Sequence, residues 1–423
     1  MTGKLKRQRL LTMIFGAFAI FFTGYPHVWS IYQPYVMEQA GWSQGQASMC
    51  FYLALSTFVF GNIVGGRMQN HYKEKTIVWI GGGIFAAGIL ASAFLIVPTP
   101  LPMYLTYGVM QGFGQGMIYT VILATVQRWF PDRTGFASGV VVTANGLCGF
   151  FLAPLSRKLL EAEGVQKTFL IVGAAITVSW ILCGIFFQAP DKSLVNAGGS
   201  AAKSGTPEVK QYTSGEMMRT KNFYLLLATM FFGLISYFMV SPVSQTYQID
   251  LGIPSAVAVS AVMLGSIVNA GARLVLPTLA DKVGRIVCIK GVLIVAVIAM
   301  GVLAVSRSLA VTVAVVLMYG CYGGIMGSFP SLTSSIFGMK HTGENYGFVM
   351  FGIVFATFGA PAISGLVSSK GYEMNVVFGI GAVFAVIAFV CLTLLGRNLV
   401  KEHAEKSAGV KNDTAQVSKP QAE

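Results

Sequence analysis

The sequence predicts an all-helical membrane protein in which twelve transmembrane helices form two related six-helix halves. Composition gives the first indication, because 54% of the 423 residues are hydrophobic and only 11% are charged, against about 25% charged residues in a typical soluble domain. Apolar runs of membrane-spanning length are the second indication, and basic clusters between the runs are the third. These features exclude a soluble enzyme, a disordered chain, a disulfide-rich scaffold and an outer-membrane barrel, whose strands alternate in hydrophobicity.

Twelve stretches are apolar enough to span a bilayer, which takes about 20 helical residues. The first follows basic residues, as the core of a signal peptide would. It is too long for such a core, and no A-x-A cleavage site follows, so we interpret it as a retained helix. The expected spans are 10–36, 46–69, 76–98, 101–128, 136–158, 167–188, 222–247, 255–279, 286–306, 309–337, 346–368 and 374–396.

The distribution of lysine and arginine predicts the orientation in the membrane. If the N-terminus lies inside, the inner segments carry 23 of these residues and the outer segments carry 5. Cytoplasmic loops carry the excess of positive charge, so we expect both termini in the cytoplasm and the chain in the cell (inner) membrane, surrounded by the lipid bilayer. The net charge of +13 is then explained without nucleic acid as a partner.

Composition also divides the chain into four parts. A stretch rich in Gly, Ser, Ala and Lys follows the sixth expected span, and the last residues are charged and polar. Such segments are typical of linkers and disordered tails. We therefore expect an N-terminal six-helix bundle (1–188), a cytoplasmic linker (189–221), a C-terminal six-helix bundle (222–396) and a disordered cytoplasmic tail (397–423).

Two loop sequences are echoed about half a chain apart. GGRMQNHYKEK follows the second span and PTLADKVGR follows the eighth, with 211 residues between Asn70 and Asp281. Similarly, 208 residues separate Thr134, after the fourth span, from Thr342, after the tenth. Together these echoes predict an internal duplication, with a binding site between the two halves near mid-membrane.

Arg273 is the one basic residue expected at mid-span, and no acidic residue is expected there. An arginine at the centre of a membrane helix costs at least ~2.5 kcal/mol, and a buried charge needs a partner. An anionic substrate held by the planar guanidinium would supply that partner. The alternative is an arginine whose side chain reaches the cytoplasmic surface, since Asp281 follows eight residues later.

Two further polar residues accompany this arginine. Asn269 precedes Arg273 by four residues and shares its helix face, so it either orients the guanidinium, bonds a substrate oxygen or packs against another helix. His27 follows Pro26, which should kink the first helix. A histidine there either carries a proton near neutral pH or packs in its neutral form.

Several motifs are similar to those of a known family. ADKVGR at 280–285 resembles the loop signature of the major facilitator superfamily, although Asn70 replaces the expected Asp in the first-half copy. RWFPDRTGFASG at 128–139, FPSLTSSIFG…NYG at 329–347 and YTSGEMMRT at 212–220 resemble the oxalate/formate antiporter family, which is related to the monocarboxylate transporters.

This resemblance implies roles for individual residues. It places Arg273 at the position of the family's substrate-binding arginine, and it favours a cavity position for His27. Asn269 stands where animal monocarboxylate transporters have an aspartate used in proton coupling. Four further residues match cavity-facing positions of the family, and packing is the alternative role for each of them: Tyr119, Asn145, Tyr322 and Met326.

The resemblance also implies a charge contact between helices that favours the outward-open state. Its members would be Asp281, Arg285, Asp132 and Arg133, and the alternative is that these four are solvated loop charges.

The family's oxalate carrier has a second cation, a lysine, and the matching position here is Ile353. One cation favours a monoanion, because a second carboxylate would lack a partner. We therefore expect a monomeric secondary transporter of small monocarboxylates such as lactate, pyruvate or formate, working by alternating access with proton symport. The alternatives are an oxalate/formate-type exchanger and a non-transporting membrane sensor. No catalytic, nucleotide-binding or metal-binding motif is present, so we expect neither enzyme activity nor a cofactor or metal.

Overall fold

The computed structural model describes residues 3–190 and 210–417, and every regular element in them is helical. The first part contains α1 (Gly3–Phe22), η1 (Tyr25–Val28), α2 (Trp29–Ala40), α3 (Gln44–Met68), α4 (Glu74–Ser92), α5 (Leu101–Met103), η2 (Tyr104–Gln111), α6 (Gly112–Trp129) and α7 (Thr134–Phe186). The second part contains α9 (Ser214–Met218), α10 (Lys221–Val240), η3 (Ser241–Val243), α11 (Ser244–Asp250), α12 (Ser255–Val283), α13 (Arg285–Val305), α14 (Ala310–Phe337), α15 (Thr342–Val349), α16 (Phe351–Ser369) and α17 (Met374–Val417).

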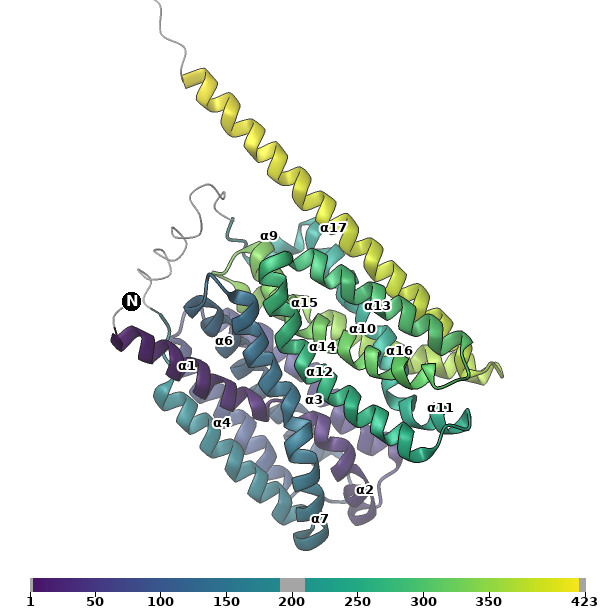
Figure 1. Cartoon of the computed structure of the whole chain (residues 1–423). Coiled ribbons are helices and arrows are strands. Elements are labelled where there is room, and N and C mark those ends of the chain that lie inside the picture. Colours follow the sequence, from purple (N-terminus) through teal and green to yellow (C-terminus); the bar gives the residue numbers. More distant parts are fainter. Residues whose placement is uncertain (1–2, 191–209, 418–423) are drawn as a thin grey trace, which may run out of the picture.

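Eleven segments of the described chain are long and apolar enough to cross a membrane. One of them is α7, whose 53 residues contain a turn at Gly164 with φ of 76°. This left-handed backbone conformation favours glycine, and it separates two spans that run in opposite directions. The described chain therefore makes twelve passes, which confirms the predicted fold class (Figure 1).

The two halves pair their helices in the same way. In the N-terminal half α1 packs on α7, α3 packs on α6, and α4 packs on the part of α7 that follows Gly164. In the C-terminal half the corresponding pairs are α10 with α16, α12 with α14, and α13 with α17. The halves meet chiefly where α12 and α14 contact α7 and where α15 and α16 contact α3. This repetition agrees with the duplication that the loop echoes predict.

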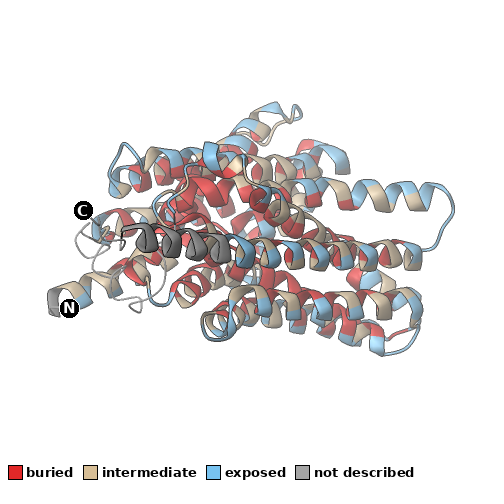
Figure 2. Ribbon diagram, turned by 90° about the horizontal axis from the view of Figure 1, so that it is seen from above, coloured by how far each residue is buried: buried red, intermediate tan, exposed pale blue. Residues whose placement is uncertain are grey.

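Buried residues lie inside the bundle and exposed residues line its outer faces and ends (Figure 2). Large apolar side chains remain exposed on those outer faces, including Val178, Met263 and Ile298. A soluble protein rarely exposes so much apolar surface, whereas lipid tails solvate it without cost. The outer faces are therefore the surface that meets the bilayer.

The first span is broken near its middle. Helix α1 ends at Phe22, a short 3-10 turn covers Tyr25–Val28, and α2 continues from Trp29. Pro26 lies in this turn, where its missing N–H interrupts the helical hydrogen bonding. The break places His27 at mid-span with an irregular backbone.

The C-terminal segment differs from the sequence prediction. Disorder was expected from residue 397, but α17 continues to Val417, and Figure 1 shows it extending beyond the bundle. Eight of the residues 397–417 are Lys, Glu or Ala, which are strong helix formers. A helix already nucleated in the membrane extends through them at little cost. Residues 418–423 lie outside the described part of the chain.

The expected linker is structured at its C-terminal end. Residues 191–209 lie outside the described part, but Thr213 and Glu216 form a capping box that starts α9, and Thr220 caps α10. Such caps satisfy the free backbone N–H groups of a helix start. The linker segment is also held to the C-terminal half, because Tyr212 N–H donates to the Phe337 carbonyl over 2.9 Å.

Candidate functional site

Arg273 lies on α12 between the two halves and is only 3% exposed. Its Nε donates to Asn269 Oδ1 over 3.0 Å, within the same helix. Its Nη1 donates to the Val142 carbonyl over 3.2 Å and to Asn145 Oδ1 over 3.0 Å, both on α7. The guanidinium is therefore held by neutral acceptors from both halves. Asn269 occupies the orienting position that its spacing allowed.

The charge of Arg273 has no acidic partner in the described chain, where no carboxylate lies within ion-pair distance of it. The guanidinium has five N–H bonds, and the three on Nε and Nη1 are engaged. The two on Nη2 make no hydrogen bond with any described residue. Two free donors on one buried cation suit the carboxylate of a ligand.

Small residues make room for this guanidinium. A Cβ added to Gly146 would lie 3.0–3.2 Å from the Cδ, Nε and Cζ atoms of Arg273. A Cβ added to Gly327 of α14 would lie 2.6 Å from the Arg273 carbonyl oxygen. Close helix contact of this kind requires glycine. The two glycines therefore allow α7 and α14 to approach the arginine from opposite halves.

Tyrosines surround the cation. The Arg273 Cζ atom lies 5.3 Å from the ring centroid of Tyr322, a cation–π distance. Tyr322 in turn stacks on Tyr237 of α10, with ring centroids 4.2 Å apart and an interplanar angle of 15°. Tyr119, Tyr237 and Tyr346 also lie close enough to Arg273 to interact with its charge. Tyr322 thus lies against the guanidinium, and Tyr237 lies behind Tyr322.

The remaining residues predicted from the sequence lie in the same region. His27 is exposed while its neighbours Pro26 and Val28 are buried; it contacts Phe51 edge-on and interacts electrostatically with Arg273. Met326 is buried one turn after Tyr322 on α14, on the face that meets α12. Asn145 also donates to Thr23 Oγ1 over 3.0 Å, which ties the break in the first span to the arginine.

The predicted site residues on η1, α6, α7, α12 and α14 therefore lie in the region of Arg273. Two neighbours were not predicted: Tyr237 and Tyr346. Tyr237 lies in a uniformly apolar run that offers no signal. Tyr346 is the tyrosine of the NYG motif that resembles the family, so a signal was present in the sequence.

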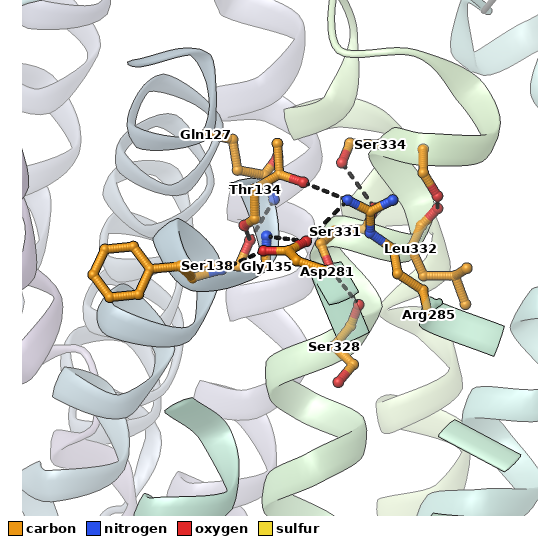
Figure 3. Close-up of polar contacts among 12 residues, drawn as sticks. Gln127, Thr134, Gly135, Ser138, Asp281, Arg285, Ser328, Ser331, Leu332 and Ser334 are labelled. Carbon is orange, nitrogen blue, oxygen red and sulfur yellow. Dashed lines mark hydrogen bonds and ion pairs between the residues drawn. The ribbon is translucent and has the colours of Figure 1, made fainter. Parts of the chain in front are cut away.

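A second polar cluster joins the halves at the end of the bundle where α1 begins. The Asp281 carboxylate accepts from the backbone N–H groups of Gly135 and Phe136 over 3.1 and 3.0 Å. Arg285 Nη2 donates to Thr134 Oγ1 over 2.8 Å and to Asp281 over 3.1 Å. Figure 3 shows both side chains directed at the first turn of α7. The Asp281 carboxylate thus caps α7, a helix of the other half. The N-cap residue of α7 itself makes no side-chain hydrogen bond to the helix start.

The pseudo-symmetric position carries a contact that no sequence pattern predicts. Glu344 of α15 is 4% exposed and accepts from Arg67 Nε over 3.0 Å and from Arg67 Nη2 over 2.9 Å. Ser214 of the linker donates to the same carboxylate oxygen over 2.7 Å. Thr120 adds a hydrogen bond to the Gly343 carbonyl over 2.9 Å. Glu344 therefore joins both halves and the linker at one point.

Asp132 and Arg133 do not take part in these contacts. They lie 3.6 Å from each other, and Asp132 lies 3.8 Å from Arg9, within the same half. Their side chains are more than half exposed, as solvated loop charges are. Of the four residues implied by the resemblance, the structure brings Asp281 and Arg285 to the junction of the halves and leaves the other two at the surface.

Comparison with known proteins identifies the family. Residues 11–353 match the family described as Major Facilitator Superfamily. The chain is 26% identical over 377 residues to the oxalate:formate antiporter of Oxalobacter formigenes, covering 88% of both chains. It is 29% identical over 230 residues to human monocarboxylate transporter 11, covering 54% of this chain and 47% of that one.

The fold is shared with solved transporters. The outward conformation of FucP superposes with a TM-score of 0.72 at 12% identity, covering 92% of this chain and 99% of that chain. A bacterial homologue of ferroportin in its outward-facing state gives 0.70 at 13% identity, with the same coverage. Since the family match covers most of the chain, and since the twelve-pass fold agrees with it, this protein belongs to the major facilitator superfamily and is a membrane transporter, not an enzyme.

Proposed function

We propose that this transporter carries small monocarboxylates of the lactate, pyruvate or formate kind by alternating access. The observation that carries the proposal is Arg273, a buried cation with three neutral acceptors and two free N–H bonds. A charge buried without an ionic partner is costly. A bound carboxylate would remove that cost, and the cation lies at the junction of the two halves, where alternating access requires the site to be.

The number of cations supports a monoanion. Ile353 lies buried on α16. By resemblance, it stands at the position where the family's oxalate carrier has its second cation. With one guanidinium in the site, a single carboxylate is neutralised and a second would be stranded. An oxalate:formate-type exchanger is the second candidate, favoured by the similarity that extends over 88% of the antiporter from Oxalobacter formigenes.

The same proposal includes an orientation and a pair of moving units. We place both termini in the cytoplasm of a cell (inner) membrane, on the strength of the lysine and arginine distribution. The Asp281 and Glu344 contacts then close the cytoplasmic end, as in an outward-facing state. Bundles 1–188 and 222–396 would rock about Arg273 as a monomer, with the linker 189–221 joining them.

Binding assays on Arg273 variants test the substrate class. Arg273→Ala should weaken lactate binding on the order of 100-fold, because charge-assisted hydrogen bonds contribute about 1.5–3 kcal/mol each. Arg273→Lys should also bind poorly, since lysine lacks the planar fork. Ligand-induced thermal shifts of the purified protein measure both.

Arg157→Ala is the matched control, because Arg157 is exposed and pairs with Glu161 on its own helix. Undiminished lactate binding by Arg273→Ala would refute the proposed site. A wild-type protein that binds oxalate more tightly than lactate would favour the exchanger instead, and Ile353→Lys should then raise oxalate affinity further.

A further inference from the structure

We infer that Thr23 is a positioning residue of the site, because its hydroxyl fixes which end of the Asn145 side-chain amide faces Arg273. This inference rests on the proposed function and deepens it. Asn145 holds the guanidinium of Arg273 from the N-terminal half, and Thr23 determines that Asn145 does so with its oxygen. A substrate carboxylate then meets a cation that is already oriented.

The three side chains form one continuous chain of hydrogen bonds. The Thr23 hydroxyl donates to the Ile20 carbonyl over 2.6 Å, and Asn145 Nδ2 donates to Thr23 Oγ1 over 3.0 Å. Arg273 Nη1 donates in turn to Asn145 Oδ1 over 3.0 Å. Thr23 is 2% exposed and Arg273 is 3% exposed, so this chain is shielded from water at both ends.

The direction of the chain is set at Thr23. A hydroxyl has one hydrogen to donate, and Thr23 donates it to the Ile20 carbonyl. The Thr23 oxygen can then only accept, so the group that Asn145 turns toward it must be the NH₂ group. The amide oxygen of Asn145 is thereby left for Arg273. A reversed amide would place two donors face to face at Arg273 and two acceptors face to face at Thr23.

Close packing holds Thr23 against Asn145. Thr23 follows the end of α1, where the first span breaks, and Gly24 comes next. A Cβ added to Gly24 would collide with the backbone carbonyl oxygen of Asn145 and with the Cβ of Cys148. Glycine therefore allows the broken part of the first span to reach α7 at the residue that holds the arginine.

The consequence for binding follows from charge and orientation. The Asn145 amide is neutral, so it orients the guanidinium and leaves the positive charge available to a carboxylate. Without the Thr23 hydroxyl the amide can rotate, and the free energy of orienting the guanidinium must then be supplied when substrate binds. Thr23 therefore raises the affinity for substrate through Asn145 and not through a contact of its own.

A double-mutant cycle with lactate as the ligand tests this role. Thr23→Val keeps the shape of the side chain and removes the hydroxyl. It should weaken lactate binding about fivefold to tenfold, the effect of one neutral hydrogen bond, whereas Thr23→Ser should bind as wild type does. In an Asn145→Ala background Thr23→Val should have no further effect, because no amide remains to be oriented. Thr168→Val is the matched control, since the Thr168 hydroxyl is buried and donates to the Gly164 carbonyl over 2.7 Å.

The outcomes separate this inference from the proposed function. Lactate binding that requires Arg273 but tolerates Thr23→Val would overturn the role of Thr23 alone. An equal loss in Thr23→Val with and without the Asn145 amide would also overturn it, because a packing defect does not depend on that amide. Failure of the wild-type protein to bind lactate would overturn both proposals. If Thr23→Val does not fold, Thr23→Cys replaces the hydroxyl with a weak acceptor of similar size, and it must show the same loss and the same dependence on Asn145.

Discussion

At the scale of single residues, the site depends on how little space surrounds one guanidinium. Gly146 and Gly149 lie three residues apart on α7. A Cβ on Gly146 would press on the Arg273 side chain, whereas a Cβ on Gly149 would meet nothing within 4 Å. The two positions therefore separate the effect of alanine on helix stability from its effect on the site, since alanine favours the helix at both.

Gly146→Ala should weaken carboxylate binding about tenfold, or about 1.4 kcal/mol, although no substrate-contacting group is removed. The added methyl displaces the guanidinium from Asn145 and Asn269. Gly149→Ala should bind as wild type does and should be slightly more stable. Titration of both purified variants with lactate measures the difference, and equal affinities would show that the arginine has room to move.

Much of this residue-scale arrangement could be predicted, for identifiable reasons. Arg273 and Asn269 are four residues apart in one helix, so their contact follows from helix geometry. The hydrogen bond from Arg273 to Asn145 joins two distant helices, and only the family resemblance indicated that Asn145 faces the cavity. The burial of Glu344 could not be predicted, because its sequence position is a helix end and its partners Arg67 and Ser214 come from other segments.

At the scale of elements, the closed end consists of two unlike contacts at equivalent places. On one side Asp281 caps the start of α7 with Arg285 beside it. On the other side the acid is Glu344, which lies at the start of α15, and the base is Arg67 of α3. The sequence echoes predict the location of both contacts. They do not predict which element carries the acid and which carries the base, because that depends on side-chain packing.

Asp281→Asn should shift the protein away from the closed-end conformation. An amide offers one acceptor oxygen for the two N–H groups of Gly135 and Phe136, and it loses the negative charge that faces the helix start and Arg285. Asp132→Asn is the control, since the Asp132 side chain is 61% exposed. Distances between spin labels at the C-terminal ends of α6 and α14 should lengthen in the first variant only. Unchanged distances in Asp281→Asn would show that this cap does not hold the halves together.

Glu344→Gln should loosen the other contact in the same assay. The substitution removes the charge that Arg67 and Ser214 share, and a buried pair that loses one partner is costly to the state that contains it. The double variant Arg67→Glu with Glu344→Arg restores an ion pair and should recover part of the closed population. A double variant as open as the single one would mean that the carboxylate acts mainly through Ser214.

At the scale of the whole molecule, composition and periodicity were sufficient for the fold. Membrane helices satisfy their own backbone hydrogen bonds, so each apolar run of adequate length predicts a span independently of the others. The predicted spans accordingly agree with the helices, and the error lies at the C-terminal end, where α17 continues past the bundle. Outside the membrane, polarity alone does not distinguish a helix from a disordered tail.

Transport by the whole molecule must also balance charge. An anion moved inward against a negative-inside potential costs about 2.3 kcal/mol per 100 mV, and a proton moved with it cancels that cost. We therefore expect lactate uptake into empty proteoliposomes to rise under an inward pH gradient. Uptake that requires internal carboxylate would establish exchange and exclude symport.

His27 is the histidine that interacts with Arg273, and it is accessible in the break of the first span. If it carries the proton, protonation must be tied to the anion, because two adjacent cations are tolerated only when a carboxylate lies between them. His27→Gln should then flatten the pH dependence of uptake near neutrality while leaving lactate binding at high pH intact. An unaltered pH profile in this variant would place the proton on the substrate, which would cross as the neutral acid.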